Sequence, residues 1–313
     1  MIPPAISNTH VLTLLRERLG LDISGVETLR PGAWSSVFAY AEGHRRWVIR
    51  FSNHGDDFDR DAYAFRFWSP DLPVPEVTHR GSLDGISYAV SQRVPGDVLD
   101  KLDRADYERT LPSLLGTLNA LRIADVTSST GYGGWDSSGN GMATSWPGHL
   151  RASLEDSPDQ RGGGWRPRLE QSPTGAHAFD RDVIVLERML KDMPNVRHVI
   201  HSDLLNYNAF VSDHHLSGVI DWGCAMYGDF LYELAWFEFW SPWYPKWQGI
   251  SVATEAHRFF ADLGVDLHNF HERLLCYQLH IGLSHQAYNA SIGRWDDLAD
   301  VTRHTVRVAD RVR

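Results

Sequence analysis

The stretch that most constrains the fold runs from His198 to Glu233 and contains two short apolar segments around a polar turn. Short apolar runs joined by a polar turn predict a β-hairpin. If the turn is centred between His214 and His215, Asn208 and Asp221 face each other across the two strands. Facing residues of an antiparallel pair lie about 5 Å apart. The sequence therefore predicts an amide and a carboxylate side by side.

A third oxygen-bearing side chain, Asp203, lies on the segment just before the hairpin. Carboxylate and amide oxygens suit Mg²⁺, whose coordination is completed by phosphates of a substrate. Taken singly, Asp203, Asn208 and Asp221 are residue types common in caps, turns and strand ends. Together they form the pattern His-x-Asp-x-x-x-x-Asn followed by Asp-Trp-Gly, which repeats the phosphoryl-transfer motifs of kinases. The pattern predicts a phosphotransfer site.

These motifs resemble those of the aminoglycoside phosphotransferases, antibiotic kinases with a protein-kinase-like fold. The similarity extends with gaps from about Leu29 to Asp297 and is weakest between Arg151 and His177. Within the family, it is greatest to the members that act on hygromycin B. The segments that carry this closer similarity are VIRFS (48–52), LPVPEV (72–77), VIDWGCAMYGD (219–229) and FWSPW (239–243).

The resemblance implies an α+β fold with two lobes. A small antiparallel β lobe, residues 1–95, would bind the nucleotide, and a mainly helical lobe, residues 96–313, would carry the catalytic loop and the substrate cleft. ATP and Mg²⁺ would be the cofactors. The reaction would transfer the γ-phosphate of ATP to a hydroxyl of an aminoglycoside, with hygromycin B as the expected substrate and antibiotic resistance as the result.

Roles for the catalytic loop follow from the same resemblance. Asp203 would orient the acceptor hydroxyl and accept its proton, while Asn208 and Asp221 would hold Mg²⁺ on the phosphates. Other residues would pack against the loop or brace it: His201, Asp229 and Glu233.

The nucleotide side departs from the usual kinase pattern at one position. Arg50 lies on the strand where kinases of this fold usually carry a phosphate-binding lysine. Arginine is always charged and grips phosphate through two N–H groups, so we expect the charge role to be kept. Asp61, on the next helix, would pair with Arg50. The resemblance also implies phosphate contacts by a loop serine and adenine contacts by the backbone of the hinge: Ser35 or Ser36, and Gln92 and Val94.

The acceptor side is expected to combine aromatic rings with acids, because both attract ammonium groups. The candidates are Glu238, Trp240, Trp243 and Trp165. Trp165 lies in a Gly- and Pro-rich stretch, residues 154–176, that predicts a long loop. Tryptophan-rich segments are also common in hydrophobic cores, and that interpretation stays open.

Composition narrows the function further. The net charge of −10 argues against a nucleic-acid partner and suits a polycationic small substrate. No apolar run approaches the roughly 18–20 residues of a membrane span, and the N-terminus lacks the features of a signal peptide. Cys224 and Cys276 lack metal-ligand spacing, so a reducing, cytoplasmic setting is the simplest interpretation. We expect a monomer.

Two other functions stay open. One is a kinase of the same fold that acts on a metabolite such as an amino alcohol. The other is a nucleotide-binding regulator without catalysis, which only the arginine at position 50 suggests. The joint presence of Asp203, Asn208 and Asp221 argues against the regulator, because a protein that only binds nucleotide needs no base.

Periodicity predicts the remaining elements. Antiparallel strand pairs are expected at 39–51 and 76–93, and an extended loop at 130–141. Helices are expected at 9–19, 56–68, 107–124, 180–193, 230–240, 255–263, 270–290 and 296–312.

Overall fold

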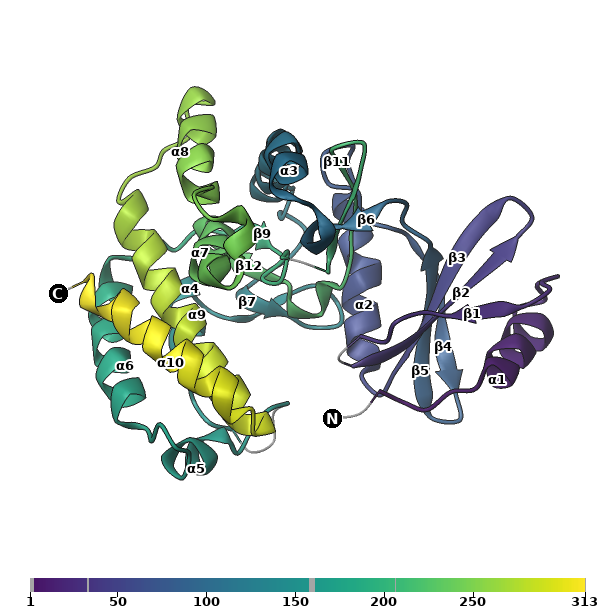
Figure 1. Ribbon diagram of the computed structural model, residues 1–313, viewed down its shortest axis with the longest axis horizontal. Helices are drawn as coiled ribbons and strands as arrows, with labels where there is room; N and C mark the ends of the chain where they lie inside the picture. Colours follow the sequence, from purple (N-terminus) through teal and green to yellow (C-terminus); the bar gives the residue numbers. More distant parts are fainter. Residues whose placement is uncertain (1–2, 33, 158–160, 206, 313) are drawn as a thin grey trace.

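The computed structural model describes residues 3–32, 34–157, 161–205 and 207–312. Figure 1 shows two lobes side by side, a β-sheet lobe built from the N-terminal part of the chain and a helical lobe built from the rest. The α+β class with two lobes is therefore confirmed. Within these ranges, no helix has both the length and the apolar character needed to span a membrane.

The sheet of the N-terminal lobe has five antiparallel strands in the order β1-β2-β3-β5-β4. The strands are β1 (Val26–Thr28), β2 (Ser35–Glu42), β3 (Arg45–Ser52), β4 (Val77–Leu83) and β5 (Ile86–Gln92). Both predicted strand pairs are present, with bounds that differ by a few residues.

One face of this sheet is covered by α1 (Asn8–Thr13) and the short π-helix η1 (Leu14–Arg18). Side chains alternate between the two faces of a strand. Phe38 of β2 and Ile49 and Phe51 of β3 point toward α1 and are almost completely buried. Arg50 therefore points to the opposite face of the sheet.

On that opposite face, α2 (Gly55–Ala64) lies between the sheet and the helical lobe and continues into η2 (Phe65–Phe67) (Figure 1). The buried residues of α2 are Phe58, Asp61 and Ala64. A carboxylate on a buried helix face requires a partner, because an unpaired buried charge is costly. Asp61 finds that partner in the sheet, as described below.

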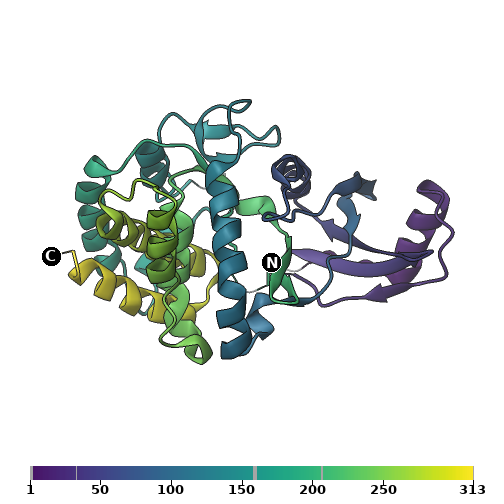
Figure 2. The same ribbon diagram turned by 90° about the horizontal axis from the view of Figure 1, so that it is seen from above.

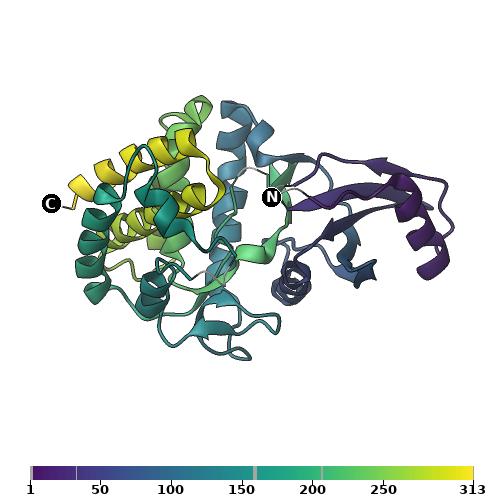
Figure 3. The same ribbon diagram turned by 90° about the horizontal axis from the view of Figure 1, so that it is seen from below.

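The helical lobe is organised around a long helix, α9 (Phe270–Ile292). Helix α10, yellow in Figures 1 and 3, runs across α9, and the C-terminus lies at the end of the molecule away from the sheet. The other helices of this lobe are α3 (Arg104–Ile123), α4 (Trp146–Ala152), α5 (Trp165–Glu170), α6 (His177–Met189), α7 (Leu231–Trp240), α8 (Val252–Asp262) and α10 (Trp295–Asp310). Short 3-10 turns are η3 (Leu99–Lys101), η4 (Leu190–Asp192), η5 (Trp222–Cys224), η6 (Ser241–Trp243) and η7 (Pro245–Trp247).

Two small antiparallel sheets support the loops that face the N-terminal lobe (Figure 2). One has the order β8-β7-β12-β9 and the other β11-β10-β6. Their strands are β6 (Asp97–Val98), β7 (Tyr132–Trp135), β8 (Gly141–Ala143), β9 (His198–Ile200), β10 (Ala209–Ser212), β11 (His215–Val219) and β12 (Met226–Gly228). The expected boundary at 95/96 lies between β5 of the large sheet and β6, which pairs with β10.

Two segments expected as loops contain regular structure. Residues 130–141 include most of the β7–β8 hairpin, whose glycine-rich sequence hides the strand pattern. The stretch 154–176 contains α5, which is only six residues long. Its first turn is held by the carboxylate of Asp156, which accepts hydrogen bonds from the amides of Gly164 (2.6 Å), Trp165 (3.3 Å) and Arg166 (2.9 Å). The predicted long loop therefore contains one short helix.

Candidate active site

The loop after β9 is held by a buried glutamate. Oε2 of Glu233, on α7, accepts hydrogen bonds from the backbone amides of His201 (2.8 Å) and Ser202 (2.9 Å). Burial raises the pKa of Glu233 to about 7, although amides of the loop favour its charged form. Ser202 has a left-handed backbone with φ of 66°, so the chain turns sharply just before Asp203.

His201 joins this loop to the end of the hairpin. Its ring Nε2 donates to the carbonyl oxygen of Ile220 (2.9 Å), and its Nδ1 accepts from the amide of Asp203 (3.2 Å). The ring also meets the edge of Trp222 at 4.8 Å between centroids. Burial lowers the pKa of His201 to about 4, so the ring is neutral near pH 7 and acts as a structural link.

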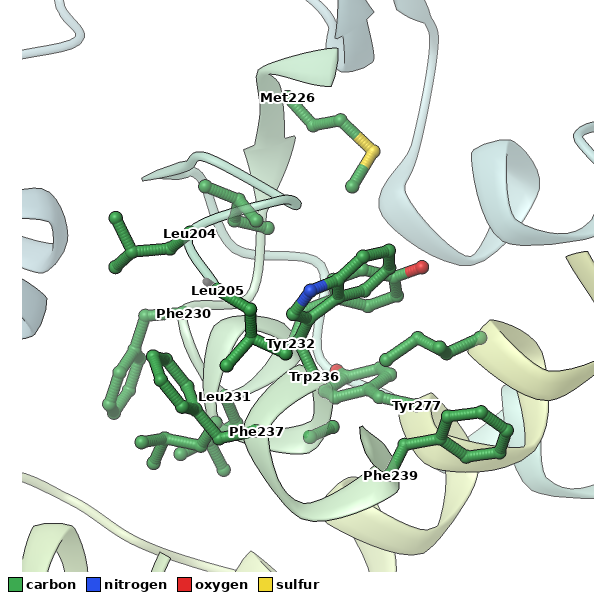
Figure 4. Packing of buried hydrophobic residues seen from close by; sticks show 14 of the residues in the cluster. Leu204, Leu205, Met226, Phe230, Leu231, Tyr232, Trp236, Phe237, Phe239 and Tyr277 are labelled. Atoms are coloured by element: carbon green, nitrogen blue, oxygen red, sulfur yellow. The ribbon is translucent and has the colours of Figure 1, made fainter. Parts of the chain in front are cut away.

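Two apolar side chains anchor the same loop in the hydrophobic core. Leu204 is fully buried and Leu205 is 6% exposed. Figure 4 shows both side chains among the aromatic residues around α7, including Phe230 and Phe237. The loop is therefore held by Glu233 through its backbone and by the core through its leucines.

Asp203 and Asn208 are directly hydrogen bonded. Nδ2 of Asn208 donates to Oδ2 of Asp203 (2.9 Å) and to its main-chain oxygen (2.8 Å). This orientation leaves Oδ1 of Asn208 as an acceptor for another group. Burial, and then the charge of Asp221, raise the pKa of Asp203 to about 8, while the hydrogen bond from Asn208 opposes the rise. A carboxylate that titrates near neutral pH is suited to accept a proton.

The hairpin that follows is present, but its register differs from the prediction by one residue. The turn is Asp213-His214, and both residues have positive φ (51° and 62°). A β-bulge in the hairpin then shifts the pairing, and the amide of Ile220 donates to the main-chain oxygen of Asn208 (2.9 Å). Asn208 therefore faces Ile220, and Asp221 lies one residue beyond the facing position.

Asp221 follows the hairpin in a left-handed conformation, with φ of 66°. In the described part of the chain, its carboxylate forms no hydrogen bond or ion pair. Its side chain is exposed to solvent, but the protein atoms that surround it, and then the carboxylates of Asp61 and Asp57, raise its pKa to about 6. Arg50 and Arg161 oppose the rise.

Arg50 and Asp61 connect the sheet, α2 and the turn that begins with Asp221. The guanidinium of Arg50 forms an ion pair with Oδ2 of Asp61, and the two side chains are 16% and 5% exposed. Oδ1 of Asp61 accepts a hydrogen bond from the amide of Trp222 (2.8 Å). Burial alone would lower the pKa of Arg50, but Asp61 and Asp221 raise it. The cation is thus fixed beside the carboxylate of Asp221.

Arg60 forms a second link between α2 and the helical lobe. Its Nε donates to the main-chain oxygen of Trp135 (2.8 Å), and one terminal N–H group donates to that of Gly223 (3.3 Å). The same terminal group pairs with Oδ1 of Asp57 at 3.0 Å. Helix α2 therefore shares hydrogen bonds with both lobes.

The two serines expected near the phosphates lie on opposite faces of β2. Ser35 pairs with Ser52 and shares the face of Arg50, which borders the cleft. Ser36 shares the face covered by α1, and its hydroxyl donates to the main-chain oxygen of Pro4 (2.6 Å). Ser36 is therefore occupied elsewhere, and only Ser35 stays a candidate.

The hinge positions lie where the chain passes between the lobes. Gln92 ends β5 and pairs with Trp47 of β3. Val94 packs so closely on Gly218 of β11 that a side chain at position 218 would overlap with it. The backbone of Gln92 and Val94 thus borders the junction of the large sheet and the hairpin.

On the acceptor side, Glu238 lines a cavity of about 420 Å³ between α3, α7 and the η6–η7 segment. Leu205 of the catalytic loop lines the same cavity, as does a stack of rings in which Tyr107 and Trp247 lie 4.3 Å apart. One carboxylate oxygen of Glu238 accepts from Ser251 Oγ and the Ala253 amide, both at 3.0 Å. Glu238 therefore both caps α8 and faces the cavity.

The predicted tryptophans do not share this cavity. Trp240 and Trp243 pack on each other, with ring centroids 5.0 Å apart, and on the histidines of α9 and α10. Trp243 is still 37% exposed. Trp165 is only 6% exposed and packs against Phe179, so it belongs to the core and the prediction of a substrate contact was wrong.

Asp229 is also a core residue, but its partners are on α9. It forms an ion pair with Arg273 (2.6 Å) and accepts from the hydroxyl of Tyr277 (2.6 Å). It braces the start of α7, and of these two acids Glu233 is the one whose hydrogen bonds reach the catalytic loop.

Three residues near the site had no distinguishing signal in the sequence. Asp57 and Arg161 form an ion pair across the cleft at 3.1 Å, and Trp247 lines the cavity beside Glu238. An acid in a helical first turn and an arginine beside glycines are common surface features, and Trp247 lies beyond two prolines that obscure the helical pattern.

The donor set suits Mg²⁺. Mg²⁺ usually takes one or two protein carboxylates and fills its coordination with phosphates and water. Asp221 and Oδ1 of Asn208 offer such a partial set, and Asp203 lies beside them. Across the described ranges, no group of three or more His, Cys, Asp or Glu could hold a metal ion by itself.

Comparison with known proteins agrees with this geometry. Residues 26–274 match the model of the phosphotransferase enzyme family. The chain is 30% identical over 302 residues to hygromycin-B 4-O-kinase from Escherichia coli. This alignment covers 96% of this chain and 84% of that protein. The crystal structure of aminoglycoside phosphotransferase APH(4)-Ia superimposes with a TM-score of 0.83 at 27% identity, covering 96% of this chain and 98% of the other.

A thermostable mutant of APH(4)-Ia in ternary complex with AMP-PNP and hygromycin B gives the same TM-score of 0.83 at 28% identity, covering 95% of this chain and 97% of that one. Sequence identity and fold thus agree over almost the whole length, and the family match covers residues 26–274. The chain belongs to the phosphotransferase enzyme family and has the kinase-like fold of its aminoglycoside phosphotransferases.

Proposed function

We propose that this chain is an ATP- and Mg²⁺-dependent kinase that phosphorylates a hydroxyl of hygromycin B and protects the cell that makes it. The observation that carries the proposal is the hydrogen bond of 2.9 Å between Asn208 and Asp203. It holds a base and a metal ligand on one loop, next to Asp221. The similarity to hygromycin-B 4-O-kinase supports the choice of acceptor.

Each residue of the loop has a role in this reaction. Asp203 orients the acceptor hydroxyl and receives its proton, since burial raises its pKa to about 8 and Asn208 fixes its carboxylate. Asn208 Oδ1 and Asp221 hold Mg²⁺, which neutralises charge on the phosphates when bound. Glu233 and His201 keep the loop in this conformation through its backbone.

The nucleotide lies between the lobes in this proposal. Arg50, held by Asp61, grips the phosphates through its remaining N–H groups. Ser35 approaches them from the same face of the sheet. Backbone groups of Gln92 and Val94 meet the adenine edge at the junction of the lobes.

The acceptor is proposed to bind where carboxylates and aromatic rings meet. Glu238 lines the cavity beside Leu205 of the catalytic loop, and Trp243 offers an exposed ring nearby in the sequence. The net charge of −10 favours cationic substrates over nucleic acids. We expect the enzyme to act as a monomer in the cytoplasm.

A transfer assay tests the proposal directly. Purified protein with Mg²⁺ and ATP would be offered hygromycin B, other aminoglycosides and amino alcohols, with product detected by mass spectrometry. We expect phosphorylated hygromycin B. Phosphorylation of another aminoglycoside, with hygromycin B left unmodified, would refute hygromycin B as the acceptor but would still support the assignment as a kinase.

Two further outcomes decide between the alternatives. Turnover of an amino alcohol alone would favour the metabolite kinase. Tight Mg·ATP binding without transfer to any acceptor would favour the regulator suggested by Arg50.

A further inference from the structure

Arg161 reaches from the helical lobe across the cleft to the N-terminal lobe. It belongs to the segment between α4 and α5, and its guanidinium pairs with Asp57 at the start of α2 (3.1 Å) and approaches Asp56 (3.7 Å). The guanidinium also lies over the ring of Trp34, 5.2 Å from its centroid. Trp34 directly precedes Ser35, the first residue of β2 and the remaining serine candidate for a phosphate contact.

The chain that follows Arg161 is held in place by hydrogen bonds and by packing. Asp156 accepts hydrogen bonds from the backbone amides at the start of α5, and Trp165 is buried beside it. Gly162 and Gly164, with φ of 83° and 74°, turn the chain between this anchored part and Arg161. Arg161 is therefore delivered to the cleft by an anchored turn.

Asp57 does not depend on Arg161 for charge compensation. Arg60, from the same helix, already pairs with Oδ1 of Asp57 at 3.0 Å. Arg161 is 35% exposed, so it can exchange this partner for another anion. Asp57 also packs on Gly223, where an added Cβ would lie 3.1 Å from its carboxylate. The guanidinium of Arg161 thus lies next to the turn that begins with Asp221.

We propose that Arg161 is a catalytic residue that binds the terminal phosphate of ATP, exchanging Asp57 for it when nucleotide enters. This inference rests on the proposed kinase function. Arg50 projects from the sheet, whereas Arg161 comes from the lobe that carries Asp203, so it approaches the phosphates from the acceptor side.

During transfer, the acceptor oxygen forms a bond to the γ-phosphorus and the bond from that phosphorus to the β–γ bridging oxygen breaks. The electron pair of the broken bond stays on ADP, and the hydroxyl proton goes to Asp203. Arg161 neither gains nor loses a proton and neutralises charge on the transferred group. Arginines in this role raise phosphoryl-transfer rates by about 10³–10⁵-fold in other enzymes.

The first test is equilibrium binding. Kd for Mg·AMP-PNP and for Mg·ADP would be measured by calorimetry for the parent and for Arg161→Gln. We expect about 10-fold weaker binding of Mg·AMP-PNP and parental binding of Mg·ADP, because only the former has a terminal phosphate for the lost cation. Turnover should fall about 10²-fold or more, and Arg161→Lys should recover part of it.

Arg151→Gln is the matched control. Arg151 is also an arginine of the helical lobe paired with a carboxylate, Glu187, at 2.8 Å, but on the surface. This variant should bind both nucleotides as the parent does. A melting curve of each variant checks that the fold is intact.

The variant Asp57→Asn distinguishes two roles for Arg161: binding the terminal phosphate, or linking the two lobes through its ion pair with Asp57. A link between the lobes predicts that Asp57→Asn, Arg161→Gln and the double variant weaken nucleotide binding equally. The proposal predicts that Asp57→Asn binds Mg·AMP-PNP at least as well as the parent and that adding Arg161→Gln still weakens it. Equal effects on AMP-PNP and ADP, or parental turnover of Arg161→Gln, would overturn the proposal. A parent that phosphorylates no acceptor would instead overturn the proposed function.

Discussion

Replacing Asp203 with asparagine should make the ligand-free protein more stable while removing most of its activity. In the folded chain, Asp203 is half-buried and lies near Asp221, so its ionised form is unfavourable. Asparagine has nearly the same shape, and its Oδ1 can still accept the hydrogen bond from Asn208 that the structure records at 2.9 Å. The variant removes a repelling charge and keeps the contacts.

The size of the effect follows from the pKa of Asp203. A value of about 8 in place of 3.8 corresponds to roughly 6 kcal/mol of unfavourable free energy for the ionised acid, at 1.36 kcal/mol per pKa unit. Relaxation of the loop and entry of water recover part of this, so we expect about 2 kcal/mol of stabilisation. Because the folded state favours the protonated acid, the parent has its full stability below about pH 4 and loses it progressively as the pH rises to about 8.

The assay is urea unfolding of parent and Asp203→Asn at pH 5 and pH 8.5, without Mg²⁺ or nucleotide. We expect the difference in unfolding free energy to grow with pH, while turnover falls by about 10²–10⁴-fold. A difference that is the same at both pH values would show that Asp203 is not held in an unfavourable charged state. Turnover within a few-fold of the parent would show that Asp203 is not the base.

Three further substitutions test the rest of the site. Arg50→Met should lower the unfolding free energy by about 3–5 kcal/mol, because it leaves the buried carboxylate of Asp61 without its cation. Combining Arg50→Met with Asp61→Asn should recover much of this loss in denaturant titrations. No recovery would argue against the ion pair. Asp221→Ala should abolish the Mg²⁺ dependence of ATP binding, and calorimetry showing unchanged Mg·ATP affinity would count against its metal role. Glu233→Ala leaves the buried amides of His201 and Ser202 without an acceptor and should cost about 2–4 kcal/mol as well as most turnover, whereas Glu233→Gln keeps an acceptor oxygen and should retain the fold in thermal melts.

The sequence locates the site better than it orients the side chains. The spacing of Asp203, Asn208 and Asp221 is enough to predict that they gather, because a strand, a loop and a hairpin leave few other arrangements. The facing pair was wrong because the turn is Asp213-His214, one residue earlier than predicted, which by itself would place Asn208 opposite Val219. A β-bulge adds one residue to the second strand and moves the partner to Ile220, and no residue type in the sequence indicates that bulge. Alternation along β2 could have separated Ser35 from Ser36, since Ser36 shares its face with buried Phe38.

The acceptor side could be predicted less well. Trp165 looks exposed because glycines and prolines surround it, and only the long-range packing on Phe179 makes it a core residue. Arg161 has no pattern of its own, and its position depends on a carboxylate five residues earlier that fixes the start of α5. Such contacts form between residues that are distant in the sequence, so they produce no local periodicity of apolar residues from which they could be predicted.

The hydrogen bonds of Arg60 have a consequence for how products leave. Because Arg60 fastens α2 to the main-chain oxygens of Trp135 and Gly223, α2 should travel with the helical lobe when the lobes separate. The sheet that carries Arg50 would then move away from Asp61, so opening the cleft must stretch this ion pair. We therefore expect the release of ADP to require breaking this salt bridge, and we expect opening of the lobes to limit the rate of the catalytic cycle.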